Sequence, residues 1–131
     1  MTTRRPTILY AETNAQVLSE QVAAFEKAGY TVVSALGGRH AVEVALAQAT
    51  FDVVVLGHTI SKDDRHHLPY RSKKLKPYVP VLVLHASCKH PKVDIAIDSR
   101  YGEHTVLEAI RTLLTDEREA GRVGHAVAAV A

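Results

Sequence analysis

The stretch that decides the fold is Phe51-Asp52-Val53-Val54-Val55-Leu56-Gly57-His58. Its four consecutive apolar residues, three of them β-branched, are typical of a strand buried on both faces, as in the middle of a parallel sheet. In an open parallel α/β sheet, the functional crevice lies just beyond the carboxyl ends of the strands. The residue that occupies this position here is Gly57, which His58 follows.

Short apolar runs on both sides of this strand alternate with segments of helical periodicity. Further strands are predicted at residues 7–11, 30–36, 79–85 and 93–98. Helices are predicted from an N-cap at Thr13 to a stop at Gly29, over residues 41–49, and from Thr105 to about Glu119. Residues 59–76 are polar, and only residues 70–75, after Pro69, have a short helical pattern. The alternation predicts parallel strands with right-handed crossovers.

The composition indicates one soluble globular domain. The chain has 131 residues, of which 47% are hydrophobic and 23% charged, and its formal net charge is +2. This charge is too small to indicate nucleic-acid binding by itself. The lone Cys88 cannot form an intramolecular disulfide, and the N-terminus lacks the apolar segment of a signal peptide. We therefore expect a cytoplasmic protein with no membrane segment.

Five short motifs make the chain similar to the receiver domain of two-component response regulators, over roughly residues 7–114. They are Ile8-Leu9-Tyr10-Ala11-Glu12, Ala28-Gly29-Tyr30-Thr31-Val32, Phe51-Asp52-Val53-Val54-Val55-Leu56, Val79-Pro80-Val81-Leu82-Val83-Leu84 and Val106-Leu107-Glu108-Ala109-Ile110. The resemblance implies a flavodoxin-like α/β fold with a doubly wound, five-stranded parallel sheet of order 2-1-3-4-5. Residues 87–92 are too few for a normal crossover, so helix 4 of the family is expected to be shortened or missing. The domain is expected at residues 7–119, with tails at 1–6 and 120–131.

The functional residues of the family are mostly replaced. Where receivers have an acidic pair that holds magnesium, this chain has Ala11-Glu12, and Gly57 stands at the position of the phospho-accepting aspartate. His85 stands at the position of the switch threonine or serine, and Asp98 or Ser99 at that of the lysine. Phosphoryl transfer to a receiver needs a carboxylate nucleophile and a divalent ion. We therefore predict a degenerate receiver, or pseudo-receiver, without aspartyl phosphorylation and without a cofactor.

Histidines surround the predicted crevice and suggest an alternative function. Glu12, His58 and His85 could form a three-ligand site for zinc, because imidazole and carboxylate are ligands of this metal. The chain lacks a paired-histidine spacing, however, and loop histidines are common without being ligands, so we expect no metal here. The alternative is a histidine-rich metal- or ligand-binding sensor, and a pH-sensitive surface is a weaker version of it.

Two other groups of residues have simpler explanations than chemistry. Ser87 and Cys88 follow His85 closely, but no oxyanion-hole motif accompanies them, and Cys88 is interpreted as a small structural thiol. The basic segment from Lys62 to Lys76 could contact phosphate backbones, but such a segment is more often a solvated face. We therefore expect neither an enzyme nor a nucleic-acid-binding protein.

The remaining function is a phosphorylation-independent signalling module of a two-component-like pathway, acting by protein–protein contact or as a homodimer. Receivers signal mainly through their fourth helix, fifth strand and fifth helix. The interaction surface is therefore predicted at Ile95, Ile97, Tyr101, Val106 and Ile110. A missing fourth helix would leave one face of the fourth and fifth strands uncovered, which would favour a partner or a second copy.

Overall fold

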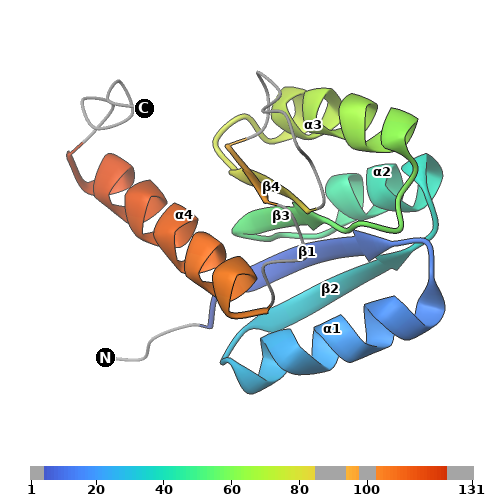
Figure 1. The fold of residues 1–131 in the computed structure, drawn as a ribbon. Helices are drawn as coiled ribbons and strands as arrows, with labels where there is room; N and C mark the ends of the chain where they lie inside the picture. Colours follow the sequence, from blue (N-terminus) through green and yellow to red (C-terminus); the bar gives the residue numbers. More distant parts are fainter. Residues whose placement is uncertain (1–4, 85–93, 98–102, 124–131) are drawn as a thin grey trace.

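A single parallel sheet forms the centre of the protein in the computed structural model, which describes residues 5–84, 94–97 and 103–123. The strands are β1 (Thr7–Glu12), β2 (Thr31–Leu36), β3 (Val53–Leu56), β4 (Val81–Leu84) and β5 (Ile95–Ile97). They lie in the order β2-β1-β3-β4-β5, and all neighbours are parallel (Figure 1). The flavodoxin-like α/β fold predicted from the sequence is confirmed.

Helices cover both faces of the sheet, as the alternation of strands and helices predicts. They are α1 (Ala15–Lys27), α2 (Arg39–Gln48), α3 (Lys62–Leu75) and α4 (Glu103–Val123). Alternate residues of β1 point to opposite faces: Ile8 and Tyr10 pack in the core with residues of α1 and α4, whereas Leu9 and Ala11 pack with residues of α2 and α3. All four residues of β3 are buried, which confirms the central position expected from its unbroken apolar run.

The N-cap of α1 is Asn14, not Thr13 as the sequence pattern predicted. The Asn14 side chain accepts a hydrogen bond from the backbone N–H of Val17 at 3.0 Å, and Asn14 has the extended backbone of an N-cap residue. At the other end, Gly29 adopts a φ of 102°, which makes it the left-handed stop that the sequence indicated. Thr13 is free of the capping role and takes part in a different set of contacts, described below.

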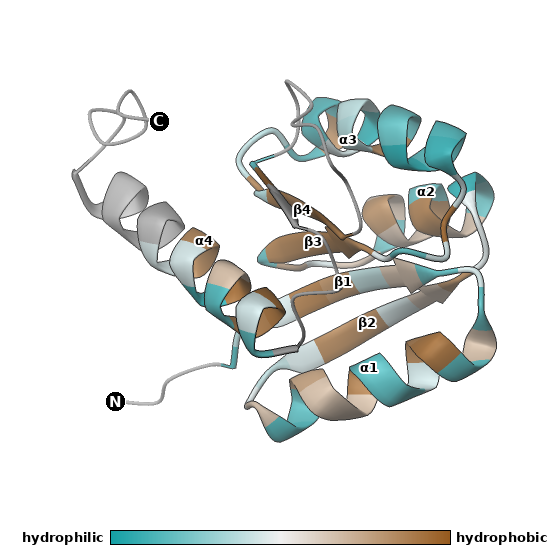
Figure 2. Cartoon of the chain, viewed as in Figure 1, coloured by the Kyte–Doolittle hydropathy of each residue, from teal (hydrophilic) through white to brown (hydrophobic). Residues whose placement is uncertain are grey.

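The prediction for α3 was wrong, because this helix begins at Lys62 and contains Pro69 in its interior. The Ser61 hydroxyl caps it by accepting from the backbone N–H of Asp64 at 3.2 Å, and Asp63 and Asp64 complement the helix dipole in the first turn. Leu68, Pro69 and Ser72 are its buried residues. Figure 2 shows α3 as mostly hydrophilic, and this narrow buried stripe gave no clear helical period in the sequence.

The C-terminal helix is longer than predicted, since α4 continues to Val123 instead of ending at about Glu119. Residues 117–120 are good helix formers, and one interior glycine, Gly121, costs only about 1 kcal/mol of helix stability. The helix thus extends into the segment that was predicted as a tail. The segment between β4 and β5, where the fourth helix of the family was expected to be shortened, lies outside the described residues, as do Ser87 and Cys88.

The expectation of an uncovered sheet face is wrong for β4. Its four residues are all buried, including Val81 and Val83, which face the side of α2 and α3 and are 0% and 3% exposed. This strand therefore offers no bare apolar surface to a partner. Within the described parts of the chain, no helix has both the length and the apolar composition needed to cross a membrane.

Candidate functional site

The predicted crevice lies at the carboxyl edge of the sheet, where β1 and β3 end side by side. Ala11 is paired in register with Leu56, and the backbone N–H of Gly57 donates to the Ala11 carbonyl at 2.9 Å. Glu12, the last residue of β1, and Gly57, the first residue after β3, are therefore close neighbours. The register places both residues at the edge that the sequence analysis indicated.

The carboxylate of Glu12 fills the space that a side chain at position 57 would need. A Cβ atom built on Gly57 would lie 1.9 Å from Cδ of Glu12 and 2.0 and 2.2 Å from its two carboxylate oxygens. Real non-bonded atoms do not approach so closely, so Glu12 in its present position requires glycine at position 57. The two positions are sterically coupled, and the carboxylate that occupies this space comes from β1 and not from the residue that follows β3.

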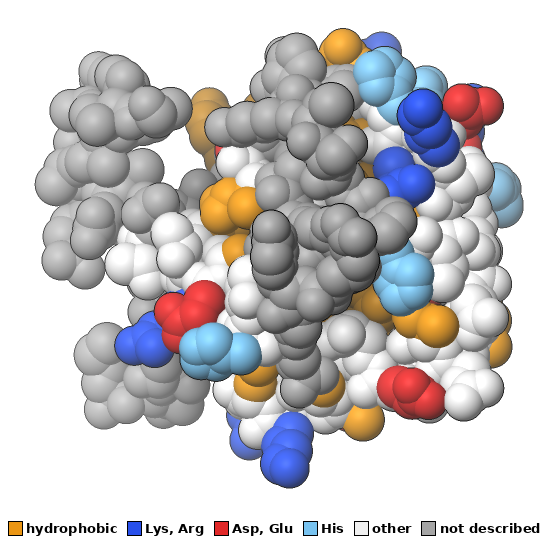
Figure 3. Space-filling view, viewed as in Figure 1, with side chains coloured by type: hydrophobic (Ala, Val, Ile, Leu, Met, Phe, Trp, Pro, Cys, Tyr) orange, Lys and Arg blue, Asp and Glu red, His pale blue; other side chains and the backbone are white. Residues whose placement is uncertain are grey.

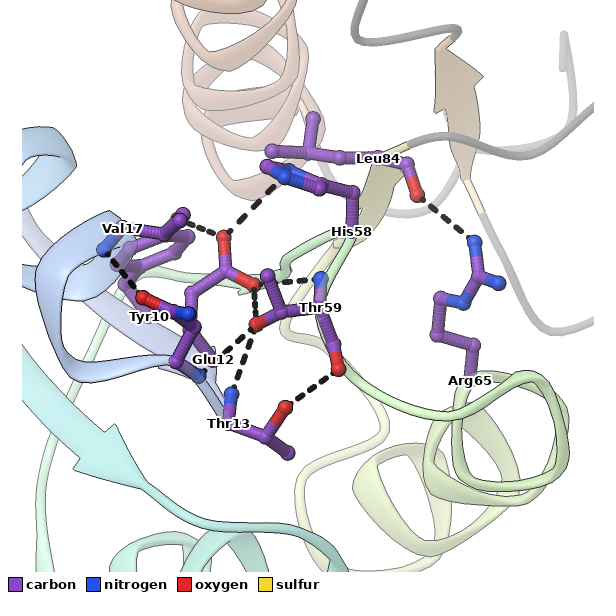
Figure 4. Close-up of polar contacts among 9 residues, drawn as sticks. Tyr10, Glu12, Thr13, Val17, His58, Thr59, Arg65 and Leu84 are labelled. Atoms are coloured by element: carbon purple, nitrogen blue, oxygen red, sulfur yellow. Dashed lines mark hydrogen bonds and ion pairs between the residues drawn. The ribbon is translucent and has the colours of Figure 1, made fainter.

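Hydrogen bonds hold the Glu12 carboxylate, which is 0% exposed. Its Oε1 accepts from the backbone N–H of Thr59 at 2.9 Å and from the Thr59 hydroxyl at 2.5 Å, and its Oε2 accepts from the Tyr10 hydroxyl (Figure 4). The Nδ1 atom of His58, a residue whose side chain is 42% exposed, lies 3.9 Å from Oε2. A buried carboxylate needs such donors to compensate for lost hydration.

Thr59 connects the loops that follow β1 and β3. Its hydroxyl accepts from the backbone N–H groups of Thr13 at 2.8 Å and Asn14 at 3.2 Å while it donates to Glu12. The Thr13 hydroxyl in turn donates to the Thr59 carbonyl at 2.5 Å (Figure 4). A hydroxyl has one donor and two acceptor sites, so the Thr59 hydroxyl is fully used. We call Glu12, Tyr10, Thr59, Thr13 and Asn14 the carboxylate clamp.

Sequence reasoning identified Glu12 and Gly57 but missed Tyr10 and Thr59. The signal for Tyr10 was its i, i+2 relation to Glu12, because residues two apart on a strand share a face. Tyr10 is 1% exposed, and its ring lies edge-on to Phe25 with centroids 5.2 Å apart. Thr59 gave no signal, since its role depends on how the loop after β3 turns back toward β1.

Burial raises the pKa of Tyr10 well above its usual range, and the hydrogen bond to Glu12 and its charge raise the pKa further. Above about pH 10 an unfolded chain loses this proton while the folded chain keeps it, so the free energy of unfolding should fall by about 1.4 kcal/mol per pH unit. Urea denaturation between about pH 9 and pH 11 measures the free energy of unfolding of the wild type and of Tyr10→Phe. The difference between these two free energies should change with pH at this slope. Equal slopes in the two proteins would contradict the buried phenol.

The structure brings two of the three proposed metal ligands together. Glu12 and His58 are neighbours, whereas His85 lies outside the described residues. Over residues 5–84, 94–97 and 103–123, no three His, Cys, Asp or Glu side chains are placed to hold a metal ion. His66 stands on the exposed side of α3, with its ring 6.1 Å from that of Tyr70. The metal-sensor alternative stays a prediction, because one of its three ligands is not described.

The predicted interaction surface was wrong at two positions. Val106 and Ile110 are 3% and 0% exposed, because the apolar stripe of α4 packs on the sheet. Ile95 is partly buried against the same core cluster. Tyr101, Ser99 and the side chain of Ile97 lie outside the described residues. The residues that made α4 recognisable in the sequence are thus core residues and cannot contact a partner.

Comparisons with known proteins agree on the fold. No protein-family model matches the chain, and no curated protein sequence matches it. Among solved structures, the signal receiver domain of an HD domain-containing protein from Pseudomonas fluorescens superposes with a TM-score of 0.78 at 17% identity, covering 93% of this chain and 96% of that one. A CheY-like receiver domain protein from Methanospirillum hungatei gives a TM-score of 0.77 at 14% identity, covering 88% and 98%.

A response regulator protein from Thermotoga maritima, in complex with Mg²⁺ and BeF, gives a TM-score of 0.73 at 15% identity and covers 83% of this chain and 99% of that one. The chain is thus similar in fold, over 83% to 93% of its length, to receiver domains of two-component signalling. Sequence identities of 14% to 17% show similarity of fold alone. The chemistry of the crevice must therefore be argued from the residues of this chain.

Proposed function

We propose that this chain is a phosphorylation-independent signalling module on the receiver scaffold, one that acts through protein contact or self-association and not as an enzyme. One observation carries the proposal: the Glu12 carboxylate occupies the space of a side chain at position 57. Position 57 itself supplies no carboxylate nucleophile, and the buried, hydrogen-bonded Glu12 carboxylate fills the volume into which a phosphorylated side chain would extend.

The chemistry of Glu12 supports the same conclusion. Magnesium sites of this kind need one or two carboxylates with free oxygen ligands, open to water and to phosphate. The Glu12 oxygens accept hydrogen bonds from Tyr10 and from both donors of Thr59, and the side chain is fully buried. Binding a metal would require breaking these hydrogen bonds. Coordination by a single carboxylate is too weak to compensate for their loss.

The carboxylate clamp also bears on how the module signals. A ligand shifts a protein between two conformations only if it binds them differently. Here hydrogen bonds within the chain itself join the loops after β1 and β3. The module is therefore expected to have one conformation of this crevice, and its contacts with partners are expected to be constitutive.

The direct test is incubation of the full chain with acetyl phosphate and Mg²⁺, followed by intact-mass spectrometry. We expect no gain of a phosphoryl group, because position 57 has no acceptor and Glu12 is inaccessible. A receiver with its aspartate intact serves as the positive control for the phosphodonor. A stoichiometric gain of one phosphoryl group, removed by hydroxylamine as acyl phosphates are, would overturn the proposal.

Self-association is measured separately by light scattering over a concentration series, with and without the phosphodonor. A mass that depends on protein concentration would assign the contact to a second copy, and a constant monomer mass would assign it to another protein. An oligomeric state that changes with acetyl phosphate would contradict phosphorylation independence.

A further inference from the structure

Most cations of α3 and its C-terminal turn are used within the molecule. Arg71 lies 3.5 Å from the carboxylate of Glu43 on α2, and Lys73 donates to Asp94 at 2.8 Å and to the Val79 carbonyl at 3.1 Å. Arg65 donates to the carbonyl of Leu84 at 3.4 Å, and the Lys76 ammonium lies 5.8 Å from the centre of the Phe51 ring. These side chains fix α3 to its neighbours, which explains much of the basic segment without a ligand.

A different set of side chains remains on the solvent side of α3 and the turn after it. We call it the α3 outer face, and it consists of Lys62, His66, Tyr70, Lys74, Leu75 and Tyr78, all of them exposed. Four of these residues are spaced by four, which places them along one face of the helix. Figure 3 shows histidine and basic side chains gathered over α3.

The α3 outer face combines apolar contact area with positive charge. Tyr70, Leu75 and Tyr78 are 44%, 42% and 83% exposed, and they are three of the five large hydrophobic residues exposed in the described chain. Lys62 and Lys74 make no ion pair within the part of the chain that the structure describes. Exposed tyrosines are enriched at the centres of protein interfaces, and cations at the rim select an acidic partner.

We propose that the α3 outer face binds an acidic segment of a partner protein, with apolar side chains of that segment on Tyr70 and Tyr78 and carboxylates near Lys62 and Lys74. The two lysines are twelve residues apart, which corresponds to about 18 Å along the helix. Asp63, also exposed, lies in the first turn, where the helix dipole favours it, so Lys74 is expected to attract the carboxylates of a partner more strongly than Lys62 does.

A protein segment fits this face better than a nucleic acid does. Binding to phosphate backbones gains affinity from each neutralised phosphate, and the two lysines of this face would give a salt dependence of only about −2 in log–log slope. The aromatic and aliphatic side chains, in contrast, are those of a protein contact. The inference rests on the proposed function, because it names the surface through which a constitutive contact would be made.

The probe is a fluorescein-labelled synthetic peptide of mixed Glu, Leu and Phe, compared with a peptide in which every Glu is replaced by Gln. Fluorescence polarisation with the full chain should show binding of the acidic peptide, weakened about tenfold by Tyr70→Ser with Tyr78→Ser and about fivefold by Lys62→Glu with Lys74→Glu. In ¹⁵N spectra the shifted amides should cluster at residues 62–78. Lys27→Glu, at the exposed end of α1, reverses one charge away from this face and should not change the affinity.

Several results would overturn the inference. These are no binding of the acidic peptide at about 1 mM protein, equal binding of the Gln peptide, an equal effect of Lys27→Glu, or tighter binding of single-stranded DNA to the same face. Thermal melts of the variants exclude unfolding as the cause. If one of these results is obtained while mass spectrometry detects no phosphorylation, the inference fails but the proposed function still holds. If the peptide binds to the α3 outer face only in the presence of acetyl phosphate, the proposed phosphorylation independence is refuted, whereas the assignment of the binding surface holds.

Discussion

Gly57→Ala is expected to destabilise the protein by about 3 kcal/mol, an unusually large effect for the addition of one methyl group. The new Cβ would lie 1.9 Å from Cδ of Glu12, so the carboxylate must leave its position. Its departure breaks the hydrogen bonds from Tyr10 and from the Thr59 hydroxyl and N–H, and charged hydrogen bonds of this kind contribute about 1.5–3 kcal/mol each before relaxation. Urea denaturation measures the loss.

The decisive comparison is a double-mutant cycle with Glu12→Ala. That variant alone should lose about 2–4 kcal/mol, because it leaves the Tyr10 hydroxyl and the Thr59 N–H unpaired. Once Glu12 is absent, however, the methyl group added at position 57 enters vacated space, and Gly57→Ala should cost less than about 1 kcal/mol. The coupling free energy between the two positions should thus be about 2 kcal/mol or more.

Gly38→Ala provides a glycine control at the same edge of the sheet. Its new Cβ would meet only an oxygen of Asp64, at 2.9 Å, on a side chain that is partly exposed and able to shift. We expect a smaller loss there, with no coupling to Glu12→Ala. Additive losses for Gly57→Ala and Glu12→Ala, within about 0.5 kcal/mol, would show that the two residues do not compete for the same space.

The fold could be predicted because burial in a parallel sheet leaves a strong pattern. Residues 53–56 are apolar without interruption, as a strand covered on both faces requires, and the structure buries all four. Gly29 likewise identified the end of α1 through its left-handed backbone. These signals are local, so the sequence contains them in full.

The candidate site could be predicted only in part, because its geometry depends on long-range contacts. The sequence showed that Gly57 lacks the acceptor carboxylate, and it left Glu12 as a weak metal ligand. It did not show that Glu12 turns into the space at position 57, a contact between residues 45 positions apart along the chain. The available signal for such a contact is a small residue at one position together with a large residue at the neighbouring position of the adjacent strand.

The misjudged elements have two different causes. α3 is held by ion pairs to Glu43 and Asp94 and by a cap at Ser61 more than by an apolar stripe, so its helical period is weak. Val106 and Ile110 were assigned to a surface because receivers use that region for contact. Their apolar character already indicated burial, and this local evidence was the better guide.

Thr59→Val is expected to cost about 2–3 kcal/mol while keeping the shape of the side chain. The variant removes the hydroxyl that donates to Glu12 and accepts from the N–H groups of Thr13 and Asn14. Thr59→Ser keeps this hydroxyl and should lose less than about 1 kcal/mol, the value of a buried methylene. Amide hydrogen exchange should accelerate at Thr13 and Asn14 in the valine variant alone. Equal protection in both variants would mean that the loops after β1 and β3 are held by something other than the Thr59 hydroxyl, and the carboxylate clamp would then not explain a constitutive state.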